Sequence, residues 1–220
     1  WGLVIVNIIV NNLALPNLVG IVSIFLIAIS TVFIVDILKL KNKITIFIVS
    51  VAMVVSPTLT GTLLYVYTSV AYCLAMLLSV LIVKLIFKEK YKIFNFIFAI
   101  VLFTLSLGIY QSYIGVTIGL TVIRLIKDLF DKNIRIKYFF INLIIMCLIV
   151  IIGGMSYKCI TEYVLQYENL DKAEYCGMNG ITVGSIINSL DKSVPRAYNE
   201  FIEFYFGDDI ITNSNYARQE

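Results

Sequence analysis

The chain has 220 residues, of which 60% are hydrophobic and 14% are charged, and its mean hydropathy is +0.95. A soluble domain of this length cannot hide so much apolar surface from water, so the composition excludes that class and indicates an all-α, polytopic bundle of transmembrane helices. The formal net charge of +3 does not indicate nucleic-acid binding, because most basic residues flank apolar segments. The sequence contains no histidine, the commonest general base and metal ligand.

Residues 1–16 are apolar but include Asn7, Asn11 and Asn12. Because side-chain amides without partners are costly in lipid, we expect an external interfacial or partly re-entrant helix here. The alternative is the end of a membrane span that begins before this sequence. Since the sequence begins at Trp1 and ends in a polar run, we interpret it as an internal piece of a longer membrane protein.

Residues 17–157 are predicted to form the transmembrane bundle, since about 17 to 20 apolar residues suffice for one crossing. The apolar stretch from residue 93 to 130 has basic residues on both sides, so it must cross an even number of times, with a turn at LSLGIYQSYIG. The predicted spans cover residues 17–38, 44–58, 63–87, 93–107, 113–126 and 138–157.

Orientation follows from the Lys and Arg residues, 12 of which lie in three clusters at residues 39–43, 84–92 and 124–137. Short loops rich in Lys and Arg stay in the cytoplasm. We therefore expect a multi-pass protein of the cell membrane, with the three clusters inside and residues 158–220 on the extracytoplasmic side.

Residues 158–220 are more polar, and two stretches in them, EYVLQYENL and SLDKSVPRAYNEFIEFYFG, have the apolar spacing of amphipathic helices. Cys159 and Cys176 both fall in this region, so a disulfide between them is one alternative and free thiols are the other. Cys73 and Cys147 lie within apolar runs and are predicted to be small buried hydrophobes.

The predicted spans contain no ionisable residue near their centres, which argues against an ion-coupled transporter. Polar residues gather instead at the outer face, and Tyr110 and Gln111 in the predicted turn are the strongest candidates there. A tyrosine hydroxyl and an amide offer donors and acceptors to sugar hydroxyls or phosphate oxygens. The alternative is an interfacial tyrosine beside a glutamine that caps the turn. Tyr113 and Tyr65 lie at the same face and complete the predicted substrate-binding set.

Asp208 and Asp209 follow an aromatic run in the external region. Adjacent carboxylates can hold a divalent cation or act as a general base. The alternative, which we favour, is a solvated loop end. A divalent cation is therefore the one cofactor that the sequence leaves open.

The stretch from Ser56 to Lys127, with SPTLTGTLLYVYTSVAYCLAMLLSVLIVKLIF followed by LFTLSLGIYQSYIGVTIGL, resembles bacterial multi-spanning membrane glucosyltransferases of the serotype-converting, O-antigen-modifying type. A run similar to SLGIYQSY closes a short helical hairpin in that family, as residues 106–113 would here. The YCGMNG stretch and AYNEFIEFYF also resemble it.

The resemblance implies a fold of the GT-C superfamily and a polyprenyl-phosphate sugar donor. It also implies transfer of glucose to a cell-surface glycan on the outer side of the membrane. In this superfamily the acidic residues that matter most lie in the first external loop, so the resemblance assigns the role of catalytic base to no residue of this chain.

The alternative from another class is a non-catalytic flippase or export component for surface polysaccharide. An acidic pair in a first external loop of the full-length sequence would favour the enzyme, whereas charged residues in further spans would favour transport.

Overall fold

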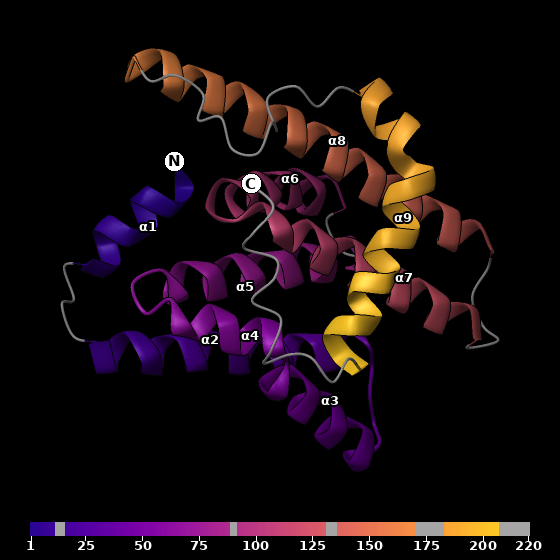
Figure 1. Ribbon diagram of the computed structural model, residues 1–220. Coiled ribbons are helices and arrows are strands. Elements are labelled where there is room, and N and C mark those ends of the chain that lie inside the picture. The colour runs from indigo at the N-terminus through magenta and orange to yellow at the C-terminus, as the bar shows by residue number, and fades with distance from the viewer. Residues whose placement is uncertain (12–15, 89–91, 131–135, 170–182, 207–220) are drawn as a thin grey trace. The chain divides into compact units, whose positions relative to one another are not determined.

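The computed structural model describes residues 1–11, 16–88, 92–130, 136–169 and 183–206, and every regular element in these ranges is helical (Figure 1). This confirms the predicted helical class. The chain divides into two compact units, residues 1–169 and 170–220. In chain order the elements are α1 (Gly2–Asn11), α2 (Pro16–Ile37), α3 (Lys43–Val55), α4 (Pro57–Leu64), α5 (Ser69–Ile86), α6 (Lys92–Ile109), the 3-10 turn η1 (Gln111–Tyr113), α7 (Ile114–Phe130), α8 (Ile136–Tyr167) and α9 (Val183–Phe206).

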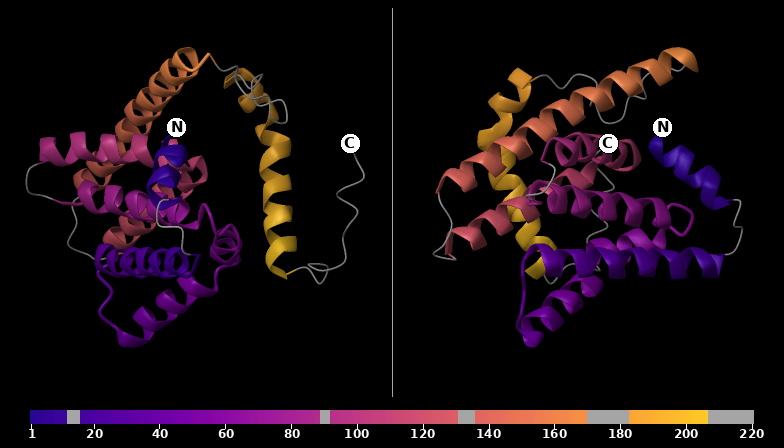
Figure 2. Two further views of the ribbon diagram at one scale, coloured as in Figure 1. Left: turned by 90° about the vertical axis from the view of Figure 1, so that its left-hand side faces the viewer. Right: turned by 180° about the vertical axis from the view of Figure 1, so that it is seen from behind.

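Helix α5 is the centre of the first unit, where it touches α1, α2, α4, α6, α7 and α8. Figures 1 and 2 show α2, α5 and α6 as neighbouring layers, with α8 crossing over α6. The buried share is 61% in α5, against 33% in α2 and 17% in α8. A helix that is apolar all round and covered on every side is the core of a membrane bundle.

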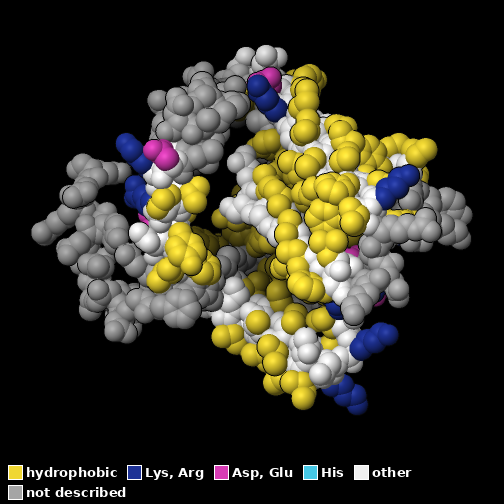
Figure 3. All heavy atoms as spheres, turned by 90° about the vertical axis from the view of Figure 1, so that its right-hand side faces the viewer, with side chains coloured by type: hydrophobic (Ala, Val, Ile, Leu, Met, Phe, Trp, Pro, Cys, Tyr) yellow, Lys and Arg dark blue, Asp and Glu magenta, His cyan; other side chains and the backbone are white. Residues whose placement is uncertain are grey.

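The outer surface of the first unit is apolar, as expected where lipid replaces water. Figure 3 shows hydrophobic side chains covering one face, with Lys and Arg side chains at its margins. Exposed large hydrophobics include Phe25 and Val32 of α2, Phe47 and Val54 of α3, and Ile144 of α8. A water-soluble protein rarely exposes so continuous an apolar surface.

Helix α7 also buries polar side chains and exposes apolar ones. Its buried residues include Thr117, Thr121, Arg124 and Asp128, which lie on one stripe at helical spacing. Its exposed large side chains, by contrast, are apolar. Polar groups that face the bundle interior and apolar groups that face outward are typical of a helix in lipid.

Among the described residues, three helices are by length and composition able to cross a membrane: Asn17–Ile37, Ser69–Ile86 and Ile136–Tyr167. The six predicted spans are therefore not all of spanning length. The 13 residues of α3 extend about 20 Å, short of the roughly 30 Å hydrocarbon core. Helix α3 stops because the extended backbone of Ser56 precedes Pro57, which begins α4.

Two predicted boundaries are wrong. The third span was expected from residue 63, but Leu63 still belongs to α4, and α5 begins only at Ser69 after a turn in which Thr68 N–H donates to Tyr65 O. The sixth was expected to end at Tyr157, but α8 continues for ten residues to Tyr167. The predicted helix EYVLQYENL is largely the end of α8, because its apolar spacing continues that of the span.

Small polar side chains form hydrogen bonds between the helices of the first unit. The hydroxyls of Ser79 in α5 and Ser106 in α6 lie 3.0 Å apart, and Ser106 also donates to the carbonyl of Ala75. Ser23 of α2 and Ser69 of α5 form a similar pair at 3.0 Å. Such contacts allow close helix approach where no hydrophobic driving force acts between helices in lipid.

Basic residues of α5 and α7 contact the end of α2 at one end of the bundle. Arg124 forms a two-point ion pair with Asp128, at 2.8 and 3.0 Å, and also donates to the carbonyl of Ile37. Lys127 donates to the carbonyls of Leu38 and Lys39. A further pair, 2.9 Å long, joins Lys84 to Asp36.

We call Lys84, Arg124 and Lys127, with the end of α2 that they contact, the basic end. Cations at a helix C-terminus stabilise its free carbonyls.

Of the two cysteines predicted to be buried, one is buried and the other is not. Cys73 is fully buried as expected, whereas Cys147 is exposed on α8, so that prediction is wrong. Cys159 is a free, exposed thiol, and its suggested partner Cys176 lies outside the described residues.

In the second unit, α9 confirms the predicted amphipathic helix. It contains Pro195 and an exposed Arg196–Glu200 ion pair of 2.8 Å.

Candidate functional site

The predicted turn between two apolar helices is present, and its backbone explains why the chain reverses there. Helix α6 ends when Tyr110 adopts an extended conformation with φ −156° and ψ 114°. The short η1 helix follows, and α7 begins at Ile114. The turn brings Tyr110, Gln111 and Tyr113 together at the N-terminal end of α7, as the sequence predicted.

Gln111 makes a tertiary contact rather than a cap. No side chain caps η1, and the Gln111 amide nitrogen donates instead to the Tyr157 hydroxyl of α8 at 2.7 Å. Because that hydroxyl oxygen accepts from Gln111, its own proton is free to be donated elsewhere. The amide oxygen of Gln111 remains an acceptor. The pair thus offers one donor and one acceptor side by side.

Trp1 extends this group. Its indole N–H donates to the Thr161 hydroxyl at 3.2 Å, and its ring lies 6.4 Å from the ring of Tyr157. Thr161 is one helical turn beyond Tyr157 on α8, so Trp1 and Gln111 contact the same stretch of α8.

Two glycines permit this meeting. A Cβ at Gly2 would lie 2.6 Å from the backbone of Gly108, and a Cβ at Gly108 would lie 2.5 Å from the Trp1 ring. Neither distance is compatible with an ordinary contact, so α1 can approach the end of α6 only because both positions lack a side chain.

We therefore expect Gly108→Ala to displace the indole and break its bond to Thr161. Trp1 is the only tryptophan of the sequence, so its emission reports on this contact alone. In the 220-residue chain in detergent, the variant should show red-shifted emission and stronger quenching by iodide. Gly115→Ala is the control, because nothing lies within 4 Å of a Cβ there. Identical emission from the two variants would contradict the close packing of Trp1 on Gly108.

Three tyrosines form a second aromatic group beside the first. The ring of Tyr110 lies 4.6 Å from Tyr72 of α5 and 5.5 Å from Tyr113. Tyr113 is buried and its side chain hydrogen-bonds to Thr62 of α4. Tyr113 therefore anchors the turn, whereas the half-exposed Tyr110 presents part of its ring at the surface.

The fourth predicted residue does not share these contacts. Tyr65 directly follows α4 and is 69% exposed. Thr62, one turn earlier in α4, is the residue that reaches the group. We use the name turn cluster for the residues that the structure brings together: Trp1, Tyr72, Tyr110, Gln111, Tyr113 and Tyr157.

Sequence reasoning missed Trp1, Tyr72 and Tyr157. Tyr157 was assigned only as the end of a span, and Trp1 only as the first residue. Nothing local marks either one, since each gains its place from a contact with a distant segment.

The turn cluster and the basic end lie at opposite ends of the same helices. Twelve residues of α5 separate Tyr72 from Lys84, a rise of about 18 Å. On α7, Tyr113 precedes the first turn and Arg124 lies in the second half. The turn cluster itself contains no charged side chain, so it can recognise a ligand through hydrogen bonds and ring contacts alone.

No group of three acidic, His or Cys side chains suited to a metal occurs in the ranges that the structure covers. The predicted pair Asp208 and Asp209 lies beyond those ranges, so the possible divalent cation stays a prediction.

Comparison with known proteins adds the family. The model of the family described as "Glucosyl transferase GtrII" matches residues 1–212. The chain belongs to the GtrII glucosyl transferase family. The match spans nearly all of the chain and confirms the family resemblance found in the sequence. No curated protein and no solved structure matches the chain significantly.

Membership of the GtrII family supports a glucosyltransferase, and the apolar helices support a membrane protein. Among the described residues, the turn cluster brings together hydrogen-bonding and aromatic side chains from four separate segments.

Proposed function

We propose that the chain is part of a membrane enzyme that moves glucose from a polyprenyl-phosphate donor to a cell-surface glycan. In this proposal, transfer takes place on the outer side of the membrane. The turn cluster forms part of the site for the donor headgroup. The observation that carries this proposal is the Gln111–Tyr157 hydrogen bond within a group of aromatic rings, in a member of a glucosyl transferase family.

The geometry suits a phosphosugar in two ways. The free proton of the Tyr157 hydroxyl can be donated to a phosphate oxygen, and the Gln111 amide oxygen can accept from a sugar hydroxyl. The exposed part of the Tyr110 ring offers an apolar surface to the C–H face of a sugar.

The chemistry requires one further group. An acceptor hydroxyl attacks the anomeric carbon, the bond from that carbon to the phosphate oxygen breaks, and the phosphate leaves with the electron pair. A carboxylate takes the proton of the acceptor. The turn cluster contains no carboxylate, so in this proposal its role is to bind and orient the donor.

Mass spectrometry of the surface glycan, from cells with and without the full protein, tests the reaction. The expected result is an added hexose only when the protein is present. An unchanged glycan mass, with the protein present in the membrane, would reject the proposal.

The proposal also fixes an orientation, which fusion reporters can test. A reporter placed after Lys41, Lys90 or Lys132 should be active in the cytoplasm, because these sites belong to the basic clusters. A reporter after Asn179 should be active outside. Cytoplasmic activity at Asn179 would overturn the predicted orientation and, with it, transfer at the outer face.

A further inference from the structure

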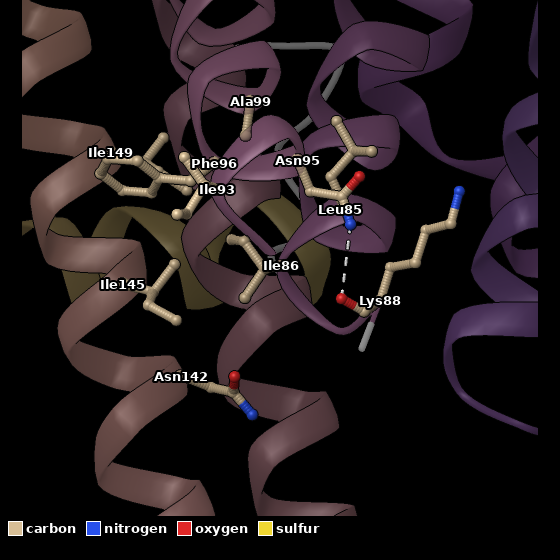
Figure 4. A pocket seen from close by; sticks show the side chains of 10 residues that line it. All are labelled: Leu85, Ile86, Lys88, Ile93, Asn95, Phe96, Ala99, Asn142, Ile145 and Ile149. Atoms are coloured by element: carbon tan, nitrogen blue, oxygen red, sulfur yellow. Dashed lines mark hydrogen bonds between the residues drawn. The ribbon is translucent and has the colours of Figure 1, made fainter. Parts of the chain in front are cut away.

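A second candidate site lies toward the basic end of the first unit, away from the turn cluster. A cavity of about 190 Å³ opens between the end of α5, the start of α6 and the first half of α8 (Figure 4). Its walls are mainly aliphatic, and its polar side chains come from Lys88, Asn95 and Asn142.

The cavity connects the bundle interior to the apolar flank of the bundle. Ala99 and Ile149 at its wall are almost fully buried, whereas Ile93 at its edge is 79% exposed. An opening through an exposed isoleucine on an apolar helix faces hydrocarbon if the bundle lies in a membrane. The cavity is therefore accessible to an acyl chain from the side.

Asn95 and Lys88 lie together at one rim of this cavity (Figure 4). The Asn95 amide is buried and donates to the backbone carbonyl of Lys88 at 3.4 Å, which ties the end of α5 to the start of α6. In Figure 4 the ammonium of Lys88 lies on the side away from the aliphatic walls. Its long apolar stem allows the charge to reach a headgroup at the rim.

Charge distinguishes Lys88 from the cations nearby. Lys84 is paired with Asp36, and Arg124 with Asp128. Lys88 is exposed and forms no ion pair within the described ranges. It therefore places a positive charge beside an apolar cavity.

We infer that this cavity binds an anionic phospholipid of the surrounding bilayer. One acyl chain lies along Phe96, Ala99 and Ile145, and the phosphate lies at the rim near Lys88. A small polar solute would leave the aliphatic walls unused, whereas a zwitterionic lipid would bring its own cation close to Lys88. This inference does not depend on glucosyl transfer.

Native mass spectrometry of the full protein tests whether the cavity binds an anionic phospholipid. Delipidated protein in detergent is titrated with dioleoyl phosphatidylglycerol or dioleoyl phosphatidylcholine, and the fraction with one bound lipid is measured. We expect several-fold more bound phosphatidylglycerol. Lys88→Gln should lower it to the level of phosphatidylcholine, whereas Lys41→Gln, an exposed lysine that does not line the cavity, should not.

A second variant separates the cavity from the surface charge. Ala99→Leu places extra volume inside the cavity and should lower binding of both lipids. Equal binding of the two lipids, or equal effects of Lys88→Gln and Lys41→Gln, would overturn the charge recognition. Undiminished binding by folded Ala99→Leu would place the lipid elsewhere. If Ala99→Leu does not fold, the exposed Lys88 variant still decides the result.

Discussion

Replacing Gln111 with leucine should lower the rate of glucosyl transfer by about one to two orders of magnitude. The leucine removes the amide that holds the Tyr157 hydroxyl, which in the proposed site donates to the phosphate. A hydrogen bond to a charged group is worth roughly 1.5–3 kcal/mol, and an interaction made in the transition state is lost from the rate in full. Transfer is measured as added hexose on the surface glycan at equal protein level in the membrane.

Ser112→Ala is the matched control, because Ser112 is an exposed neighbour in the same turn whose side chain has no hydrogen bond in the described ranges. It should transfer at the normal rate.

Tyr157→Phe tests whether the two residues act together. If both hold the same headgroup, the double variant should lose little more than either single one, since residues in one network are not additive. Normal transfer by Gln111→Leu and Tyr110→Ala would remove both Gln111 and Tyr110 from the site.

The turn cluster illustrates what local sequence can and cannot reveal. The reversal near Gln111 was predictable because Gly108 and polar residues interrupt an apolar run that is too long for one crossing. The partner of Gln111 was not, because Tyr157 is 46 residues away and looks like any interfacial tyrosine. Contacts between helices depend on how the helices pack, and a single sequence does not encode that in a local pattern.

Some helix boundaries could likewise be predicted from the sequence, and others could not. Helix α2 begins at Pro16 and ends before the first basic cluster, so the predicted span 17–38 differs from the helix by one residue at each end. The start of α5 was misplaced because LLYVYT contains neither glycine nor proline, and apolar residues conceal the turn. Proline, glycine and charge mark boundaries well, whereas a turn within apolar sequence gives no such signal.

The buried ion pair of α7 was also missed, although its spacing offered a signal. Arg124 and Asp128 are four residues apart on the stripe that includes Thr117 and Thr121. Arg124 was assigned to a basic cluster at the membrane face, where lysines and arginines are normally solvated. Its side chain instead points into the bundle and donates to a carbonyl at the end of α2.

This pair supports the prediction with the largest expected effect on stability. Arg124→Met should destabilise the bundle by about 3–5 kcal/mol, because Asp128 would stay buried without a partner. The substitution also removes the donor to the carbonyl of Ile37. A lower unfolding temperature in detergent and a lower protein level in the membrane are the expected measurements.

Two variants separate the ion pair from other effects. Arg124→Met combined with Asp128→Leu should recover much of the loss, since replacing a whole buried pair with apolar groups is often close to neutral. Lys158→Met removes one partner of the exposed Lys158–Glu162 pair, which has the same spacing on α8, and should change stability by no more than about 0.5 kcal/mol. If Arg124→Met and Lys158→Met were equally mild, the Asp128 carboxylate would have to reach water. The basic end would then be a solvated surface, and its contacts would not stabilise the packing of α7 against the end of α2.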